Sequence, residues 1–183
     1  MARIILITGG SRSGKSIYAQ RIAESSPGDR TYIATCPVVD EEMAERIRKH
    51  KKARQAGNWQ TIEETMDLAA ALIRASGSRV ILVDCLTLWI NNLMYDAELQ
   101  NRDLGEEEIV ERCRDILGAC DAISGTIIFV TNEIGMGIVP DNPLSRRYRD
   151  LAGRCNQVMA ESADAVVFMV SGLPLNVKGE KII

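Results

Sequence analysis

The sequence is poor in several residue types, and each shortage narrows what the protein can be. Its 183 residues include one histidine, and aromatic residues make up 4%. That is too few for the rows of rings on which single-stranded bases stack. A net charge of −3 also argues against a generally basic nucleic-acid binder. The longest apolar runs, at 4–7 and 165–170, are far shorter than the ~20 residues that span a bilayer.

The cysteines are odd in number and widely spaced, at Cys36, Cys85, Cys113, Cys120 and Cys155. They form neither a C-x-x-C pair nor a set with the spacing of zinc ligands. The first residues run directly into an apolar strand pattern, without the layout of a signal peptide. We therefore expect reduced thiols and a cytoplasmic protein.

Short apolar runs alternate with helical stretches along the chain. We predict strands near 4–7, 31–34, 80–83, 126–130 and 166–170, with helices between them and a short edge hairpin after residue 172. The polar stretch 96–108 is predicted to be a surface loop. Continuous apolar strands alternating with helices are typical of a mainly parallel sheet covered by helices on both faces. The pattern predicts one α/β domain over residues 1–183.

A glycine-rich motif follows the first predicted strand. Residues Gly9-Gly10-Ser11-Arg12-Ser13-Gly14-Lys15-Ser16 fit the P-loop pattern G-x-x-x-x-G-K-S without a mismatch, and a helix is predicted from Lys15. Glycines let the backbone turn so that N–H groups point inward, and the helix N-terminus adds to their attraction for phosphate. We predict that Lys15 reaches the β- and γ-phosphates of a nucleotide and that Ser16 ligates Mg²⁺.

Two acids follow predicted strands. Asp84 closes the strand at 80–83, the place where a P-loop protein holds Mg²⁺ directly or through water. The alternative is that Asp84 caps the next turn. Glu133 follows the strand at 126–130 and is the second candidate acid. Carboxyl ends of parallel strands share one edge of the sheet, where ligands of α/β folds bind.

His50 is the only histidine, and it lies in a polar helix predicted over about 40–53. Between residues 46 and 54, six of nine residues are basic: Arg46, Arg48, Lys49, Lys51, Lys52 and Arg54. In one interpretation, this is a solvated helix face with a structural histidine. In the other, the cations disfavour the protonated imidazole, so its nitrogen is a nucleophile near pH 7 beside a bound triphosphate.

These residues together resemble a known family, the bifunctional adenosylcobinamide kinase/adenosylcobinamide-phosphate guanylyltransferases of cobalamin biosynthesis. The resemblance covers nearly the whole chain. Its most specific stretch is Thr131-Asn132-Glu133-Ile134-Gly135-Met136-Gly137-Ile138-Val139-Pro140. The P-loop, Tyr32-Ile33-Ala34-Thr35, His50-Lys51, Asp84-Cys85-Leu86-Thr87 and Asn156-Gln157 extend it. Some members have Arg-Pro after the His-Lys segment, where this sequence has Gln55.

The resemblance implies two reactions. ATP or GTP phosphorylates the aminopropanol hydroxyl of adenosylcobinamide, and GTP then gives GMP to that phosphate through a covalent GMP-histidine. The products are adenosylcobinamide-GDP and pyrophosphate. By position, His50 is the guanylylated residue. The resemblance also implies a RecA-like P-loop fold, a corrinoid substrate and an oligomer, often a trimer.

The resemblance further implies a set of nucleotide-binding residues. Beside the P-loop, they are Ala34, Thr35, Cys36, Lys51, Lys52, Ala53, Arg54, Glu63 and Asp84. Two other functions are weighed against this one. The first is an ordinary small-molecule P-loop kinase with a structural His50. The second is a nucleotide-dependent module whose basic helix binds nucleic acid, which the negative net charge disfavours.

Overall fold

The computed structural model describes residues 1–37 and 58–182. The strands are β1 (Arg3–Gly9), β2 (Arg30–Ala34), β3 (Trp59–Glu63), β4 (Val80–Asp84), β5 (Thr126–Val130), β6 (Ala165–Val170) and β7 (Leu173–Lys178). The helices are α1 (Lys15–Ser25), α3 (Leu68–Arg74), α4 (Leu86–Leu99), α5 (Glu106–Asp121) and α6 (Pro143–Ser162). The helix predicted over 40–53 lies outside the described residues.

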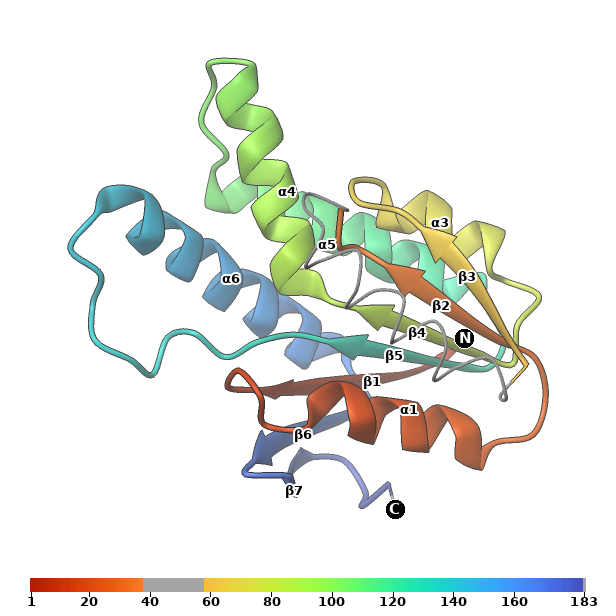
Figure 1. Ribbon diagram of the computed structural model, residues 1–183. Helices are drawn as coiled ribbons and strands as arrows, with labels where there is room; N and C mark the ends of the chain where they lie inside the picture. The colour runs from red at the N-terminus through yellow and green to blue at the C-terminus, as the bar shows by residue number, and fades with distance from the viewer. Residues whose placement is uncertain (38–57, 183) are drawn as a thin grey trace.

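The described strands form one seven-stranded sheet in the order β3-β2-β4-β5-β1-β6-β7 (Figure 1). All neighbours are parallel except β6 and β7, which pair antiparallel. This confirms the predicted mainly parallel sheet and its antiparallel C-terminal edge. Strand β1 lies between β5 and β6, so the segment that leads into the P-loop is held on both sides.

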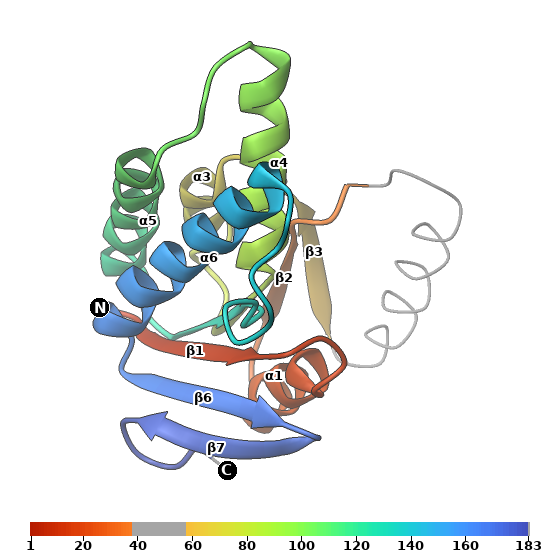
Figure 2. The same cartoon turned by 90° about the vertical axis from the view of Figure 1, so that its left-hand side faces the viewer.

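Alternating side chains of β1 point to the two faces of the sheet. Ile4 and Leu6 pack in the core under α3, α4, α5 and α6, whereas Ile5 and Ile7 pack in the core under α1. Figure 2 shows α1 on one side of the sheet and α3, α4, α5 and α6 on the opposite side. Both faces are covered, as predicted, but the described helices are divided unequally between them.

Local signals explain where several helices begin. The side chain of Asp67 accepts a hydrogen bond from Ala70 N at the start of α3. At the start of α6, Asn142 accepts one from Ser145 N, and Pro143 occupies the first turn. These caps satisfy N–H groups that have no partner inside the helix. The α6 cap matters most for the site, because α6 follows the segment that leaves β5.

The predicted surface loop over 96–108 is wrong at both ends. Helix α4 continues to Leu99 and α5 begins at Glu106, which leaves only residues 100–105 between them. Polar residues are a weak loop signal here, because a helix needs only one buried stripe. Leu93 and Ala97 continue that stripe into the core, while Tyr95 between them is exposed. The first turn of α5 contains three glutamates, whose negative charges interact favourably with the positive end of the helix dipole.

Candidate functional site

The P-loop leaves the carboxyl end of β1 and runs directly into α1. Gly14 is the N-cap residue of α1 and has φ 93°, a left-handed conformation that side chains other than glycine adopt at a cost. At Gly9, φ is 146°, and a Cβ would lie 2.6 Å from the carbonyl oxygen of Met169. The loop therefore requires glycine at both positions. At Gly14 the backbone conformation requires it, and at Gly9 both the conformation and the lack of space for a Cβ require it.

The turn after β6 supports the P-loop from outside. Gly172 N donates to Ser13 O at 3.0 Å, and a Cβ on Gly14 would lie 3.3 Å from the Cα of Gly172. This contact leaves no periodic signal in the sequence, because Ser13 and Gly172 are 159 positions apart. Only the fold, which pairs β6 with β1, brings the two turns together.

Lys15 is buried with 7% of its surface exposed. Its ammonium Nζ donates to Gly10 O at 2.6 Å and lies 3.5 Å from Ser13 Oγ. Burial lowers the pKa of Lys15 below its ordinary value, and the acidic groups of Cys85 and Asp84 oppose that shift. The Lys15 ammonium is thus held inside the P-loop, where the sequence motif predicts that phosphates bind.

Asp84 lies at the carboxyl end of β4, at the same edge of the sheet as the P-loop. Its Oδ2 accepts a hydrogen bond from the Tyr32 hydroxyl at 3.1 Å. The N-cap residue of α4 is Cys85, and no side chain caps that helix. Asp84 therefore does not cap α4, which was the alternative role considered from the sequence.

Thr35 holds the backbone that follows Asp84. Its hydroxyl donates to Cys85 O at 2.8 Å and accepts from Cys85 N at 2.7 Å, while Asn92 Nδ2 donates to Thr35 O. The Thr35 side chain is buried, so these contacts occupy its hydroxyl. Its neighbours Ala34 and Cys36 are partly exposed. Strand pairing aligns Ala34 with Asp84 on one side and with Glu63 on the other.

Glu133 lies beside the P-loop. Its backbone N–H donates to Gly9 O at 2.9 Å, and its Oε1 accepts from Gly135 N at 2.5 Å. Within the described part of the chain, Oε2 has no hydrogen-bond partner. The structure thus brings together the P-loop, Asp84 and Glu133, as the shared sheet edge predicted. His50, Lys51, Lys52, Ala53 and Arg54 lie outside the described residues.

The donor chemistry at this edge suits a magnesium nucleotide. Ser16 supplies a partly exposed hydroxyl in the first turn of α1, and Asp84 supplies a carboxylate; oxygen donors are what Mg²⁺ prefers. Thr8 precedes the loop, and its Oγ1 is buried without a hydrogen-bond partner among the described residues. Such an atom is rare and is expected where a further polar group is accommodated.

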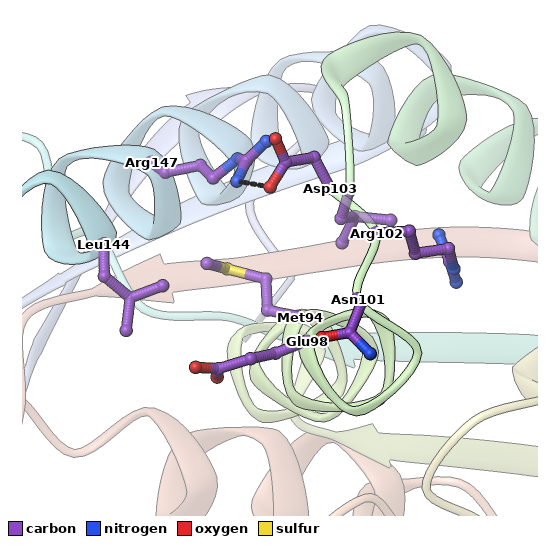
Figure 3. A pocket seen from close by; sticks show the side chains of 8 residues that line it. Met94, Glu98, Asn101, Arg102, Asp103, Leu144 and Arg147 are labelled. Atoms are coloured by element: carbon purple, nitrogen blue, oxygen red, sulfur yellow. Dashed lines mark hydrogen bonds and ion pairs between the residues drawn. The ribbon is translucent and has the colours of Figure 1, made fainter.

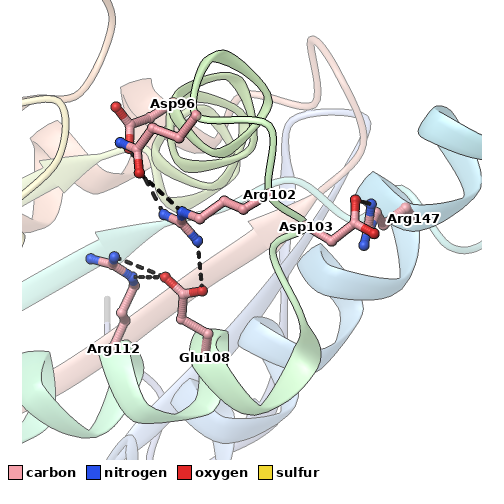
Figure 4. Close-up of polar contacts among 7 residues, drawn as sticks. Asp96, Arg102, Asp103, Glu108, Arg112 and Arg147 are labelled. Carbon is pink, nitrogen blue, oxygen red and sulfur yellow. Dashed lines mark hydrogen bonds and ion pairs between the residues drawn. The ribbon is translucent and has the colours of Figure 1, made fainter.

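A separate cavity of 390 Å³ lies between the end of α4 and the start of α6 (Figure 3). Both arginines that line it are paired with acids. Arg147 pairs with Asp103 at 2.5 Å, and Arg102 pairs with Glu108 at 2.9 Å and Asp96 at 3.8 Å (Figure 4). The pKa of Asp103 is lowered by its hydrogen bond and charge pairing with Arg147. With its arginines paired, this cavity is a poorer phosphate site than the P-loop.

In the part of the chain that the structure describes, no helix has the length and apolar character needed to cross a membrane.

Comparison with known proteins agrees with this geometry. The family described as "Cobinamide kinase / cobinamide phosphate guanyltransferase" matches residues 5–177. The "Bifunctional adenosylcobalamin biosynthesis protein CobP" of Pseudomonas aeruginosa is 47% identical over 178 residues, covering 97% of this chain and 98% of its own. The CobU proteins of Salmonella typhimurium and Escherichia coli are 40% and 37% identical over 183 residues, covering 96% of this chain and 99% of theirs. The chain therefore belongs to the cobinamide kinase / cobinamide phosphate guanylyltransferase family, the bifunctional enzymes of adenosylcobalamin biosynthesis.

Proposed function

We propose that this enzyme phosphorylates adenosylcobinamide at the P-loop with ATP or GTP and then transfers GMP from GTP to the new phosphate through His50. The observation that carries the kinase half is the cluster of Lys15, Asp84 and Glu133 at one sheet edge. The guanylyl-transfer half is supported by the family and by the chemistry of a histidine among cations.

In the kinase step, the aminopropanol hydroxyl attacks the γ-phosphorus and the bond to the β-phosphate oxygen breaks. Lys15 stabilises the charge that moves onto the phosphate oxygens, together with the N–H groups of Gly9-Gly10-Ser11-Arg12-Ser13-Gly14. Glu133 is the proposed acceptor of the hydroxyl proton, because its Oε2 is open and its loop is bonded to Gly9. The products are adenosylcobinamide phosphate and a nucleoside diphosphate.

Ser16 and Asp84 are the proposed ligands of Mg²⁺. Ser16 lies in the first turn of α1 and Asp84 at the carboxyl end of β4, where a P-loop protein holds the ion. Bound there, Mg²⁺ would neutralise charge that develops on the leaving group. Tyr32 holds one oxygen of Asp84 and leaves the other for the ion or its water.

In the transfer step, a neutral imidazole nitrogen of His50 attacks the α-phosphorus of GTP, and the bond to pyrophosphate breaks. The phosphate of adenosylcobinamide phosphate then attacks the same phosphorus and displaces His50. We assign the contacts with GTP to Ala34, Thr35, Cys36, Lys51, Lys52, Ala53, Arg54, Glu63 and Asp84. For Thr35, the contact falls to the second lone pair of its carbonyl oxygen, since its hydroxyl holds Cys85 and its N–H donates to Asp84 O.

The proposal extends to the setting of the enzyme. Residues 1–183 act as one domain and assemble with further copies, and a trimer is the proposed assembly. The partners are nucleotides and a corrinoid, not a nucleic acid. No disulfide joins the five cysteines, all of which lie in the described residues, and this supports a cytoplasmic enzyme.

The deciding experiment is intact-mass analysis after incubation with GTP and Mg²⁺. A retained mass equal to GMP, stable in base and lost in acid, is the expected signature of a phosphoramidate on histidine. Adenosylcobinamide phosphate should discharge it. Absence of any adduct, with phosphorylation of adenosylcobinamide intact, would instead identify an ordinary kinase with a structural His50. A label on Lys51 or Lys52 would move the nucleophile away from His50.

A further inference from the structure

One amide on α6 bonds to two consecutive residues of the segment that leaves β5. Asn156 Oδ1 accepts a hydrogen bond from Thr131 Oγ1 at 2.7 Å, and its Nδ2 donates to Asn132 O at 3.1 Å. Both polar ends of the side chain are therefore used on neighbouring residues. The backbone of Thr131 is held as well, because its N–H donates to Ile7 O at 3.0 Å.

The contacts continue from Asn132 to the start of α4. Asn132 Nδ2 donates to Thr87 Oγ1 at 3.1 Å, and Thr87 Oγ1 lies 3.2 Å from Cys85 Sγ. Tyr148, also on α6, donates its hydroxyl to Thr87 O at 3.1 Å. Thr87 and Thr131 are buried, so a partner lost from either would leave a costly unsatisfied group. The network joins the residues that follow β4 to those that follow β5.

The segment held by Asn156 is the one that carries Glu133. Immediately after Asn132, the N–H of Glu133 donates to Gly9 O, at the entry to the P-loop. Fixing Thr131 and Asn132 therefore fixes the direction in which the Glu133 carboxylate leaves the backbone. A displacement of about 1 Å at such a group can lower a rate by 10²-fold.

Packing alone does not require an amide at this position. Helix α6 buries Leu151, Ala152, Cys155 and Met159 against the sheet, whereas Asn156 is only partly buried. The apolar stripe is enough to hold the helix. The Asn156 amide therefore orients the segment that follows β5 and adds little buried area to the core.

We infer that Asn156 is a positioning residue for phosphoryl transfer, which acts through Thr131 and Asn132 on Glu133 and does not itself touch the substrates. This inference rests on the proposed function, in which Glu133 accepts the proton of the attacking hydroxyl. The Asn156 side chain sets where that carboxylate lies relative to the P-loop.

The test compares Asn156→Leu with Thr131→Val, which keeps its shape and removes only the hydroxyl. Gln157→Leu is the matched control, because Gln157 is exposed on the same helix. Well below the Tm of each variant, we expect Asn156→Leu to lower the kcat for phosphorylation of adenosylcobinamide on the order of 10- to 100-fold. Thr131→Val should lower it less, and Gln157→Leu should leave it unchanged. The KM for nucleotide should change little. Wild-type kcat in Asn156→Leu would overturn the inference.

A double-mutant cycle separates positioning from general damage. If Asn156 acts through Glu133, Asn156→Leu should have little further effect on kcat in a Glu133→Gln background. An equal loss in both backgrounds, or full activity in Glu133→Gln alone, would overturn the inference.

Hydrogen exchange gives a readout without substrates. The amide of Glu133 should exchange faster in Asn156→Leu than in wild type and Gln157→Leu, because its bond to Gly9 O opens more often. Unchanged exchange would also overturn the inference. Failure of wild-type enzyme to phosphorylate adenosylcobinamide would count against the proposed function, and the exchange result would still decide the role of Asn156.

Discussion

The ammonium of Lys15 donates to the carbonyl oxygen of Gly10, 2.6 Å away in the same loop. A buried cation without a partner would cost several kcal/mol, and this contact supplies one before any nucleotide is present. An arriving phosphate offers the ammonium a charged acceptor in place of a neutral one. The P-loop thus positions the ammonium for a phosphate, and the exchange of a neutral acceptor for a charged one favours phosphate binding.

Removing that ammonium should slow phosphoryl transfer without unfolding the protein. In Lys15→Ala, we expect the rate to fall on the order of 10²–10³, the usual cost of losing one electrostatic contact with the transition state. The matched control is Lys181→Ala, because Lys181 is exposed at the C-terminal end. Initial rates and thermal unfolding of both variants provide the measurement. Normal nucleotide binding and turnover in Lys15→Ala would refute the phosphate assignment.

Nucleotide affinity should fall at alkaline pH because of Lys15. Burial lowers its pKa in the free enzyme below 10.5, and bound phosphates would raise it again, so binding takes up a proton. The affinity gained from the cation is fully present below the free-enzyme pKa and declines as pH rises through it. Calorimetric titration across this range should show the decline. Lys15→Arg, which does not titrate there, should remove this part of the slope; an identical slope would point to another group.

Removing the charge of Asp84 should weaken the response to magnesium. In Asp84→Asn, we expect the Mg²⁺ concentration for half-maximal activity to rise, because an amide oxygen is a poorer ligand than a carboxylate. Tyr32→Phe removes the hydroxyl that bonds to Asp84 Oδ2 and should produce a smaller shift. Activity titrations with MgCl₂ measure both. An unchanged curve in Asp84→Asn would exclude Asp84 as a ligand.

Replacing His50 should separate the two activities. We expect His50→Ala to abolish the GMP adduct and GMP transfer and to keep most kinase activity, since phosphorylation of a hydroxyl needs no nitrogen nucleophile. Intact mass and separate assays of the two steps give the result. Full GMP transfer in His50→Ala would contradict the assignment and leave the P-loop kinase intact.

Cys36 should be the cysteine that reacts first with iodoacetamide, and GTP should protect it. It is partly exposed, whereas the other four are buried. Burial raises the pKa of Cys85 to about 11 and that of Cys120 to about 12, so their thiolates are scarce at neutral pH. Peptide mass mapping after brief alkylation measures the order. Equal labelling with and without GTP would remove Cys36 from the proposed nucleotide contacts.

The elements that position the site were predictable because their signals are local. The run Val80-Ile81-Leu82-Val83 is apolar throughout and forms β4, an interior strand of the sheet. The P-loop pattern includes its own strand and helix context, so Lys15 and Ser16 were predicted together with their surroundings. The loop predicted over 96–108 is longer than the observed one, because the polar residues after 95 hide the spacing of the buried residues in α4.

Contacts between distant segments could not be predicted. The bonds of Gly172 to Ser13 and of Asn156 to Thr131 join side chains or turns far apart in the sequence. An asparagine on a helix, or a glycine in a turn, lies in the same kind of local sequence whether or not it supports a site. Only the order of strands in the sheet determines which of them meet.

The place of β1 in the sheet has a consequence for synthesis of the protein. The phosphate-binding motif continues β1, and β1 pairs with β5 and β6, from Arg3↔Thr126 to Gly9↔Met169. The residues of the motif are therefore made before both strands that hold β1 in place. Strands β2, β3 and β4 can pair among themselves meanwhile, but contacts as far apart in sequence as those of β1 form slowly. During synthesis, the phosphate-binding loop thus reaches its folded position only after β5 and β6 have been made, and an earlier pause leaves the enzyme without its nucleotide site.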